Sequence, residues 1–178
     1  MKKIVFLGVL LLACALVASA DIVDYNLANR AWDFGVMPGI TLAQGVAKGI
    51  ADGFTYRHWG LSWSGGIHTY TSPTTADGVN ENDVYMLWST PKTVRSVKFV
   101  GDLSTTYDEI RLYSLNAGGN PANYADWTQI WYALGLSSVQ LLMIDLADDY
   151  VLNGLRIYVH RNGGDGRTPI GEVAVYGP

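Results

Sequence analysis

Large aromatic and histidine side chains gather in one segment of the sequence that has little other regular pattern. The segment 58–83 is rich in Gly, Ser and Thr, and it carries Trp63, Tyr70, His58 and His68. An aromatic ring can stack against the apolar face of a sugar ring, while polar side chains hydrogen-bond to the sugar hydroxyls. Aromatic side chains in a long loop either pack down on the core or bind a ligand. The residues alone leave both roles open, and Trp63, flanked by Ser and Gly, is the better candidate for an exposed side chain.

Motifs for covalent or metal-dependent catalysis are absent from the sequence. It contains no G-x-S-x-G motif, no H-E-x-x-H motif and no phosphate-binding loop, and its three histidines lack the spacing of zinc ligands. Short acidic runs such as Asp148-Asp149 are typical of solvated turns, whereas a glycosidase needs two carboxyl groups placed across a cleft. We therefore predict that the protein is not an enzyme, with a small secreted hydrolase as the alternative.

One acid interrupts the apolar pattern near the C-terminus. In the run 170–176, alternation places Glu172 on the same face as Ile170, Ala174 and Tyr176. A charge in a terminal strand is either a solvated residue at the edge of a sheet or a ligand that holds something. The pattern alone leaves both interpretations open.

The elements that must position these residues are predicted to be β-strands. Strand-like runs are 83–88, 93–100, 109–115, 127–133, 139–146, 153–159 and 171–176, separated by turn sequences such as Ser89-Thr90-Pro91. Helical periodicity is weak throughout. Many short strands with turn residues between them predict an all-β sandwich or barrel. Trp88, Trp127 and Trp131 fall in these runs and are expected in the core.

The N-terminal residues predict export. Lys2 and Lys3 precede an apolar run, and Ala18-Ser19-Ala20 fits a small-x-small cleavage site, so residues 1–20 are typical of a secretory signal peptide. The apolar run is too short to predict a membrane span. An alternative is lipoprotein anchoring at Cys14, because Leu11-Leu12-Ala13-Cys14 loosely resembles a lipobox. We expect the protein to be secreted, periplasmic or at the cell surface.

Composition limits the partners and the number of domains. The chain has a net charge of −4 and no basic stripe, which argues against nucleic acid and anionic membranes. Cys14 is the single cysteine, so no disulfide is possible after cleavage of the signal. We expect an N-terminal arm or first strand over 21–39 and one domain over 40–178.

Four segments in a fixed order resemble the discoidin-like, coagulation-factor type C domains and the related galactose-binding carbohydrate-binding modules. They are ADGFTYRHW, STPKTVRSVKF, YDEIRLYSLNAGGNPANYADWTQI and LLMIDLADDYVLNGLRIYVHRNGGDGRTPIGEVAVYG. The resemblance covers about residues 40–177, nearly the whole chain after the signal. It implies a jelly-roll β-sandwich with a galactose-binding-like fold.

The resemblance also implies a structural Ca²⁺ near one end of the sandwich. The side-chain ligands would be Asp52 and Glu172, and the candidate carbonyl donors would be Gly49, Phe54, Arg57 and Gly171. Ca²⁺ takes six to eight oxygen ligands, including backbone carbonyls, so this donor set suits it. Arg57 stands where family members often have a threonine, so its side chain must point away from the ion.

In the sugar-binding relatives, ligand residues come from three loops, which would correspond here to the segments after the Asp52-Gly53 turn, 101–107 and 161–168. The candidates are Trp63, Tyr70, His58, His68, Asp102, Arg161, Asn162, Asp165 and Arg167. Galactose-binding relatives commonly carry an arginine where this chain has Gly101-Asp102, so the sugar stays open.

The expected function is that of an exported, non-catalytic, lectin-like module that binds a glycan or glycoconjugate. The alternative is a module for protein binding, surface adhesion or assembly on the same fold, because discoidin-like domains also bind proteins. A glycan array would distinguish these two functions.

Overall fold

The computed structural model describes residues 26–40, 50–51, 81–101, 107–136, 141–161, 168, 170 and 172–178. The elements are η1 (Leu27–Arg30), β1 (Asp33–Val36), β2 (Glu81–Val100), β3 (Tyr107–Leu115), η3 (Tyr124–Asp126), β4 (Trp127–Leu134), β5 (Leu141–Arg161) and β6 (Glu172–Tyr176). Both η elements are short 3₁₀ turns, and no α-helix lies within these ranges. The prediction of an all-β fold is confirmed.

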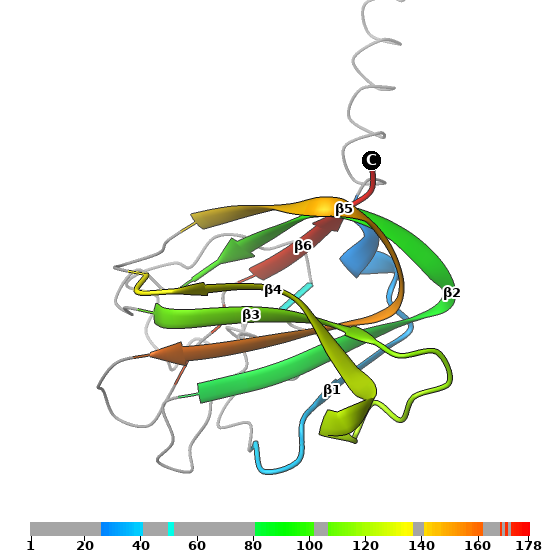
Figure 1. Cartoon of the computed structure of the whole chain (residues 1–178), viewed down its shortest axis with the longest axis horizontal. Coiled ribbons are helices and arrows are strands. Elements are labelled where there is room, and N and C mark those ends of the chain that lie inside the picture. Colours follow the sequence, from blue (N-terminus) through cyan, green and yellow to red (C-terminus); the bar gives the residue numbers. More distant parts are fainter. Residues whose placement is uncertain are drawn as a thin grey trace, which may run out of the picture.

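The strands form antiparallel pairs in the order β1-β2-β5-β3-β4, and β6 pairs with the second half of β2. β2 and β5 are long, and each bends so that it passes through two layers (Figure 1). The large layer contains β1, residues 81–88, residues 154–161, β3 and β4, while the small layer contains residues 92–100, residues 141–152 and β6. This arrangement is a β-sandwich.

The bend in β2 corrects one expectation from the sequence. Ser89-Thr90-Pro91 lies inside β2 and does not separate two strands, although the pairing with β5 is interrupted between Leu87 and Lys92. Proline has no backbone N–H to donate, so it is tolerated where the ladder is interrupted. The predicted runs 83–88 and 93–100 are therefore two halves of one strand, and the runs 139–146 and 153–159 likewise correspond to parts of β5.

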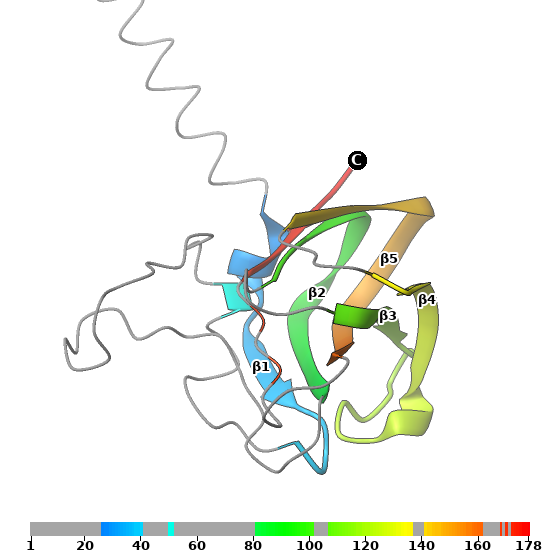
Figure 2. The same ribbon diagram turned by 90° about the vertical axis from the view of Figure 1, so that its left-hand side faces the viewer.

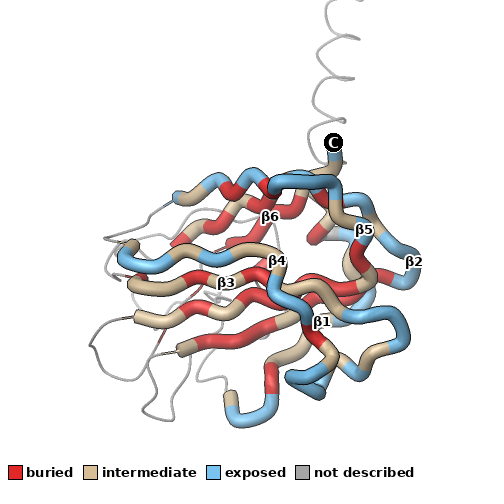
Figure 3. Tube along the Cα trace, viewed as in Figure 1, coloured by how far each residue is buried: buried red, intermediate tan, exposed pale blue. Residues whose placement is uncertain are grey.

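The core lies between the two layers. Alternating side chains of β2, including Val84 and Met86 in the large layer and Val97 and Phe99 in the small layer, are almost completely buried in one cluster. The rings of Phe99 and Tyr107 meet edge to face with their centroids 5.3 Å apart, which joins the two layers. Figure 3 shows this burial along the inner strands and β6, with exposed residues at the bend.

The three tryptophans expected in the core differ in position. Trp88 is buried in the main cluster, and its indole N–H donates to the Leu27 carbonyl at 2.7 Å. Trp131 is partly buried against the same cluster. Trp127 is buried in a separate, smaller cluster with Met37 and Leu87. The expectation is confirmed for Trp88 and Trp127, which are both buried, and in part for Trp131.

The N-terminal part of the described chain packs onto both layers. β1 pairs with β2 from Asp33↔Leu87 to Val36↔Val84. The Asn26 side chain accepts a hydrogen bond from the Val175 N–H at 2.9 Å and so connects η1 to β6. Residues 1–25, which contain the predicted signal peptide and Cys14, are outside the ranges given above. Within those ranges, no helix is long and apolar enough to cross a membrane.

Candidate functional site

Strand ends from both layers meet at one end of the sandwich. Glu81 pairs with His160 and Tyr107 with Arg161 in the large layer, while Val100 pairs with both Leu141 and Glu172 in the small layer. We refer to this end as the loop end, and to the opposite end, at residues 89–92, as the bend end. Figure 2 shows the sandwich with the loop end toward the viewer.

The topology explains how segments far apart in sequence reach the loop end. Each of the three predicted ligand segments is flanked there by a described strand end. The first segment is followed by the start of β2 at Glu81, the second lies between the end of β2 at Val100 and the start of β3 at Tyr107, and the third follows the end of β5 at Arg161. A rigid sandwich that holds variable loops at one end is a common way to build a binding surface. The strand ends therefore support the prediction that these segments converge.

Most of the predicted sugar ligands are not covered by the described residues. Trp63, Tyr70, His58, His68, Asp102, Asn162, Asp165 and Arg167 lie outside them. Arg161 is described, and it is the half-buried last residue of β5, opposite Tyr107. Of the predicted candidates, Arg161 is thus placed at the loop end by the structure.

A polar pair at the loop end was not singled out by the sequence. His160 Nδ1 lies 2.7 Å from Asp108 Oδ1, and each side chain is a little more than one third exposed. The spacing of the histidines indicates no zinc site, and nothing local in the sequence pairs His160 with an acid 52 positions earlier. The contact orients the imidazole ring, and both side chains stay partly exposed to solvent at the loop end.

Glu172 is completely buried, with 0% of the residue exposed. This excludes the interpretation of a solvated edge residue. Asn82 and Thr168 are also fully buried. The Asn82 side-chain amide donates a hydrogen bond to the Thr168 carbonyl at 2.9 Å, which links the start of β2 to the residues before β6. A buried carboxylate needs hydrogen bonds or a cation to offset its lost hydration. A completely buried oxygen donor at the loop end is what the expected Ca²⁺ ligand requires.

The other predicted Ca²⁺ ligands cannot be placed. Asp52, Gly49, Phe54, Arg57 and Gly171 all fall in the gaps of the described ranges. Those ranges contain no group of three or more metal-ligating side chains. The expected site combines two carboxylates with backbone carbonyls, and its one described member, Glu172, is a fully buried carboxylate. Calcium binding stays a prediction.

The sequence missed a buried ion pair in the large layer. Arg156 donates from Nε and Nη2 to the two carboxylate oxygens of Asp83, at 2.7 and 2.9 Å, and both side chains are almost completely buried. The Arg156 guanidinium lies 4.1 Å from the ring centroid of Tyr113 and 4.8 Å from that of Tyr124. Asp83 lies near the start of β2, in the strand-like run 83–88, and Arg156 lies on the neighbouring β5.

The burial of Asp83 in this ion pair predicts that the stability of the protein depends on pH. Burial raises the pKa of Asp83 from 3.8 to about 6, although the hydrogen bond and charge of Arg156 lower it. Between these two values the folded protein binds more protons than the unfolded chain, so the contribution of Asp83 to the free energy of unfolding falls as the pH rises from about 4 to about 6. We expect this fall in wild type relative to Asp83→Asn, measured by urea unfolding across that range. A constant difference between the two proteins would contradict it.

Comparisons with known proteins were made by sequence and by structure. The sequence matches no protein-family model and no curated protein. Its structure is similar to chitosan-binding module 1 of a chitosanase/glucanase from Paenibacillus sp. IK-5, with a TM-score of 0.63, 20% identity, and coverage of 86% of this chain and 99% of the module.

Two further solved structures are family 32 carbohydrate-binding modules. The module of Clostridium perfringens NanJ, in complex with galactose, has a TM-score of 0.60 at 12% identity and covers 85% of this chain and 98% of its own. The module of AlyQ, in complex with 4,5-unsaturated mannuronic acid, has a TM-score of 0.58 at 12% identity. The match covers 82% of this chain and 95% of the AlyQ module.

The chain therefore has a galactose-binding-like β-sandwich fold. More narrowly, it has the fold of the family 32 carbohydrate-binding modules. The expected fold class is confirmed.

Proposed function

We propose that this protein is an exported, non-catalytic module that binds a glycan at the loop end and holds a structural Ca²⁺ through Glu172. The observation that carries the proposal is the convergence of the strand ends that flank all three predicted ligand segments, on a fold shared with carbohydrate-binding modules. The solved neighbours bind chitosan, galactose or an unsaturated mannuronic acid, which supports a saccharide ligand and leaves its identity open.

Recognition on this surface requires no chemical step. Aromatic side chains such as Trp63 would cover the apolar face of a sugar ring, and polar groups such as Arg161 and the His160–Asp108 pair would orient its hydroxyls. The sandwich holds the flanking strand ends rigid, so little ordering is needed on binding. The Ca²⁺, when bound, would tie the start of β6 to an early segment of the chain and stiffen the same end.

The acids that the structure describes near this end have partners that suit a binding role. Asp83 is paired with Arg156, Asp108 contacts His160, and Glu81 accepts a hydrogen bond from Tyr158. Hydrolysis of a glycosidic bond needs two carboxyl groups facing each other across the substrate. These contacts favour binding without turnover.

A glycan array followed by calorimetric titration tests the proposal. We expect binding that is reversed by free sugar, and we expect Trp63→Ala to weaken it by about tenfold or more, because a stacking aromatic contributes on the order of 1 kcal/mol beyond its buried area. Trp32→Ala is the matched control, since Trp32 is 65% exposed and lies beside Leu87, toward the bend end. Its affinity should equal that of wild type.

Blank arrays with correctly folded protein would contradict the proposal. They would favour the alternative of a protein-binding or adhesion module on the same fold. Equal losses in Trp63→Ala and Trp32→Ala would also contradict it, since the effect would then not be specific to the loop end.

A further inference from the structure

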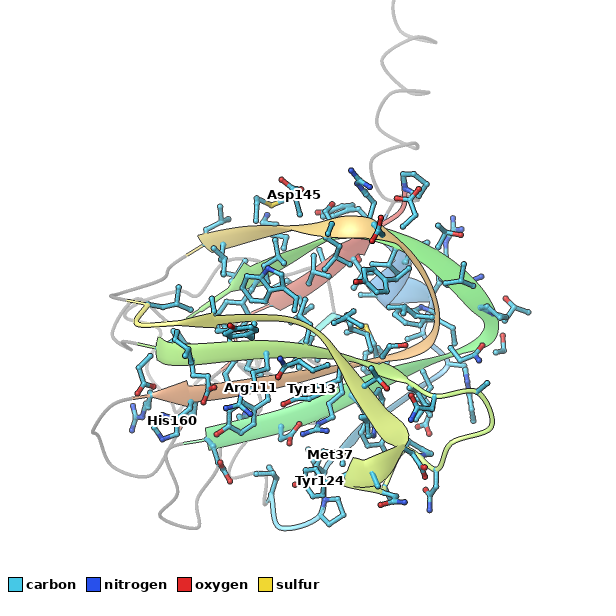
Figure 4. All side chains as sticks on the ribbon, in the orientation of Figure 1. Met37, Arg111, Tyr113, Tyr124, Asp145 and His160 are labelled. Atoms are coloured by element: carbon cyan, nitrogen blue, oxygen red, sulfur yellow. The ribbon has the colours of Figure 1, made fainter. Side chains whose placement is uncertain are left out.

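The outer face of the large layer carries three rows of side chains that cross β2, β5, β3 and β4 in register. The rows are Glu81, His160, Glu109 and Leu134; Asp83, Tyr158, Arg111 and Tyr132; and Tyr85, Arg156, Tyr113 and Gln129. We refer to these residues as the sheet face. Figure 4 shows Arg111 and Tyr113 in the middle of this face and His160 at its loop end.

Contacts within the sheet face hold its polar groups in fixed positions. The Tyr158 hydroxyl donates to Glu81 Oε2 at 3.0 Å, and the Arg111 guanidinium lies 5.4 Å from the Tyr158 ring centroid while it pairs with Glu109. Burial and the Glu81 hydrogen bond raise the pKa of the Tyr158 hydroxyl, so it stays protonated as a donor. Groups fixed in this way lose little freedom when a ligand binds.

The part of the sheet face over β3 and β4 is open to solvent. Tyr132 is 58% exposed, Gln129 is exposed, and the Arg111 side chain is 40% exposed beside them. Within the neighbouring row, Arg156 is covered by Tyr124, whose hydroxyl donates to the Pro38 carbonyl. The open part, which we call the platform, therefore presents the Tyr132 ring and the Arg111 guanidinium to solvent, and Tyr124 of η3 covers the neighbouring Arg156.

The two arginines of the sheet face are each paired with an acid of the same face, while Glu81 accepts the Tyr158 hydrogen bond. Arg156 is paired with Asp83, Arg111 with Glu109, and His160 contacts Asp108. Paired charges leave hydrogen-bond donors and acceptors without a strong net field, which suits a neutral, hydroxyl-rich ligand better than a highly charged one. An exposed tyrosine beside such groups matches the pattern needed to stack on a sugar ring.

The sheet face is continuous with the loop end. His160 and Glu81 form the outermost row of the face and are also strand ends at the loop end. Neighbouring strands lie about 4.8 Å apart, so the four strands span roughly 14 Å, which exceeds a single sugar ring. A chain held at the loop end has a direct path onto this platform.

We propose that the sheet face is an extended glycan-binding surface, with Tyr132 as its stacking platform, that takes further units of a neutral oligosaccharide whose end is bound at the loop end. The inference depends on the proposed function of the loop end. It gives that function a ligand class, a neutral chain of several sugar units.

The test compares a monosaccharide with the hexasaccharide of the same sugar, for neutral β-linked glucose, galactose and N-acetylglucosamine, by calorimetric titration. Wild type should bind one hexasaccharide more tightly than its monosaccharide. Tyr132→Ala should weaken the hexasaccharide by on the order of tenfold and leave the monosaccharide unchanged, whereas Tyr132→Phe, which keeps the ring, should resemble wild type. Met143→Ala, at an exposed position of the small layer, is the control and should change neither affinity.

Two other results would contradict the extended surface, and one of them would also contradict the proposed function. A hexasaccharide that binds no more tightly than its monosaccharide, or that Tyr132→Ala leaves unaffected, would overturn the extended surface and leave the loop end intact. Wild type that binds none of the sugars would overturn both the extended surface and the neutral-glycan function. A melting temperature of Tyr132→Ala equal to that of wild type ensures that a lost affinity reports on binding.

Discussion

Arg156→Ala is expected to lower the free energy of unfolding by about 3–5 kcal/mol. The substitution removes a guanidinium that donates two hydrogen bonds to Asp83 and leaves that carboxylate almost completely buried without its cation. The rings of Tyr113 and Tyr124, which now lie near the guanidinium, also lose their contact with it. Urea unfolding at pH 7 measures the loss.

Two variants show whether the loss comes from the unpaired charge. Arg95→Ala breaks an exposed pair with Asp149, at 3.4 Å, and should cost at most about 1 kcal/mol. The double variant Arg156→Met with Asp83→Leu removes both charges and should recover much of the stability lost by Arg156→Ala. If Arg156→Ala costs no more than Arg95→Ala, the buried pair does not stabilise the large layer as described.

Removal of Ca²⁺ is expected to lower the melting temperature by about 5–10 °C when the ion is initially present at a hundred times its dissociation constant. Binding to the folded state at that concentration contributes about 2.7 kcal/mol, and each kcal/mol shifts the melting temperature of a domain of this size by roughly 2–4 °C. Glu172→Gln keeps the shape of the side chain and removes its charge, so this variant should lose the response to Ca²⁺. Thermal unfolding with and without a chelator measures both effects.

Asp145→Asn is the matched control for the calcium prediction. Asp145 is an exposed acid in the small layer, so this variant should respond to Ca²⁺ as wild type does. Identical melting curves of wild type with chelator and with added Ca²⁺ would show that no stabilising calcium site exists. A response retained in Glu172→Gln would show that the ion is bound elsewhere.

The architecture could be predicted from the sequence because its determinants are local. Alternation in segments such as 93–100, with turn residues between the strand-like runs, indicates a sandwich without knowledge of the pairing. The continuity of β2 across Ser89-Thr90-Pro91 could not be predicted, because a proline at a bend and a proline in a turn leave the same local pattern. The distinction depends on how β5 pairs with both halves of β2.

Less of the candidate site could be predicted from the sequence, because its contacts join residues that are far apart in the chain. Asp83 and Arg156 are 73 positions apart, and Asp108 and His160 are 52 apart, so only the pairing of β2, β5 and β3 brings them together. The full burial of Glu172 also depends on packing, although its place between apolar residues was a signal. The loop residues Trp63 and Tyr70 stay predictions from composition and resemblance.

An amide chemical-shift titration shows directly whether a glycan binds at the loop end. The ligand is a sugar that binds on the glycan array. We expect saturable shifts at Gly101, Tyr107 and Arg161, and none at the bend-end residues Ser89 and Lys92. Shifts confined to the bend end, or spectra that no sugar on the array changes, would contradict it.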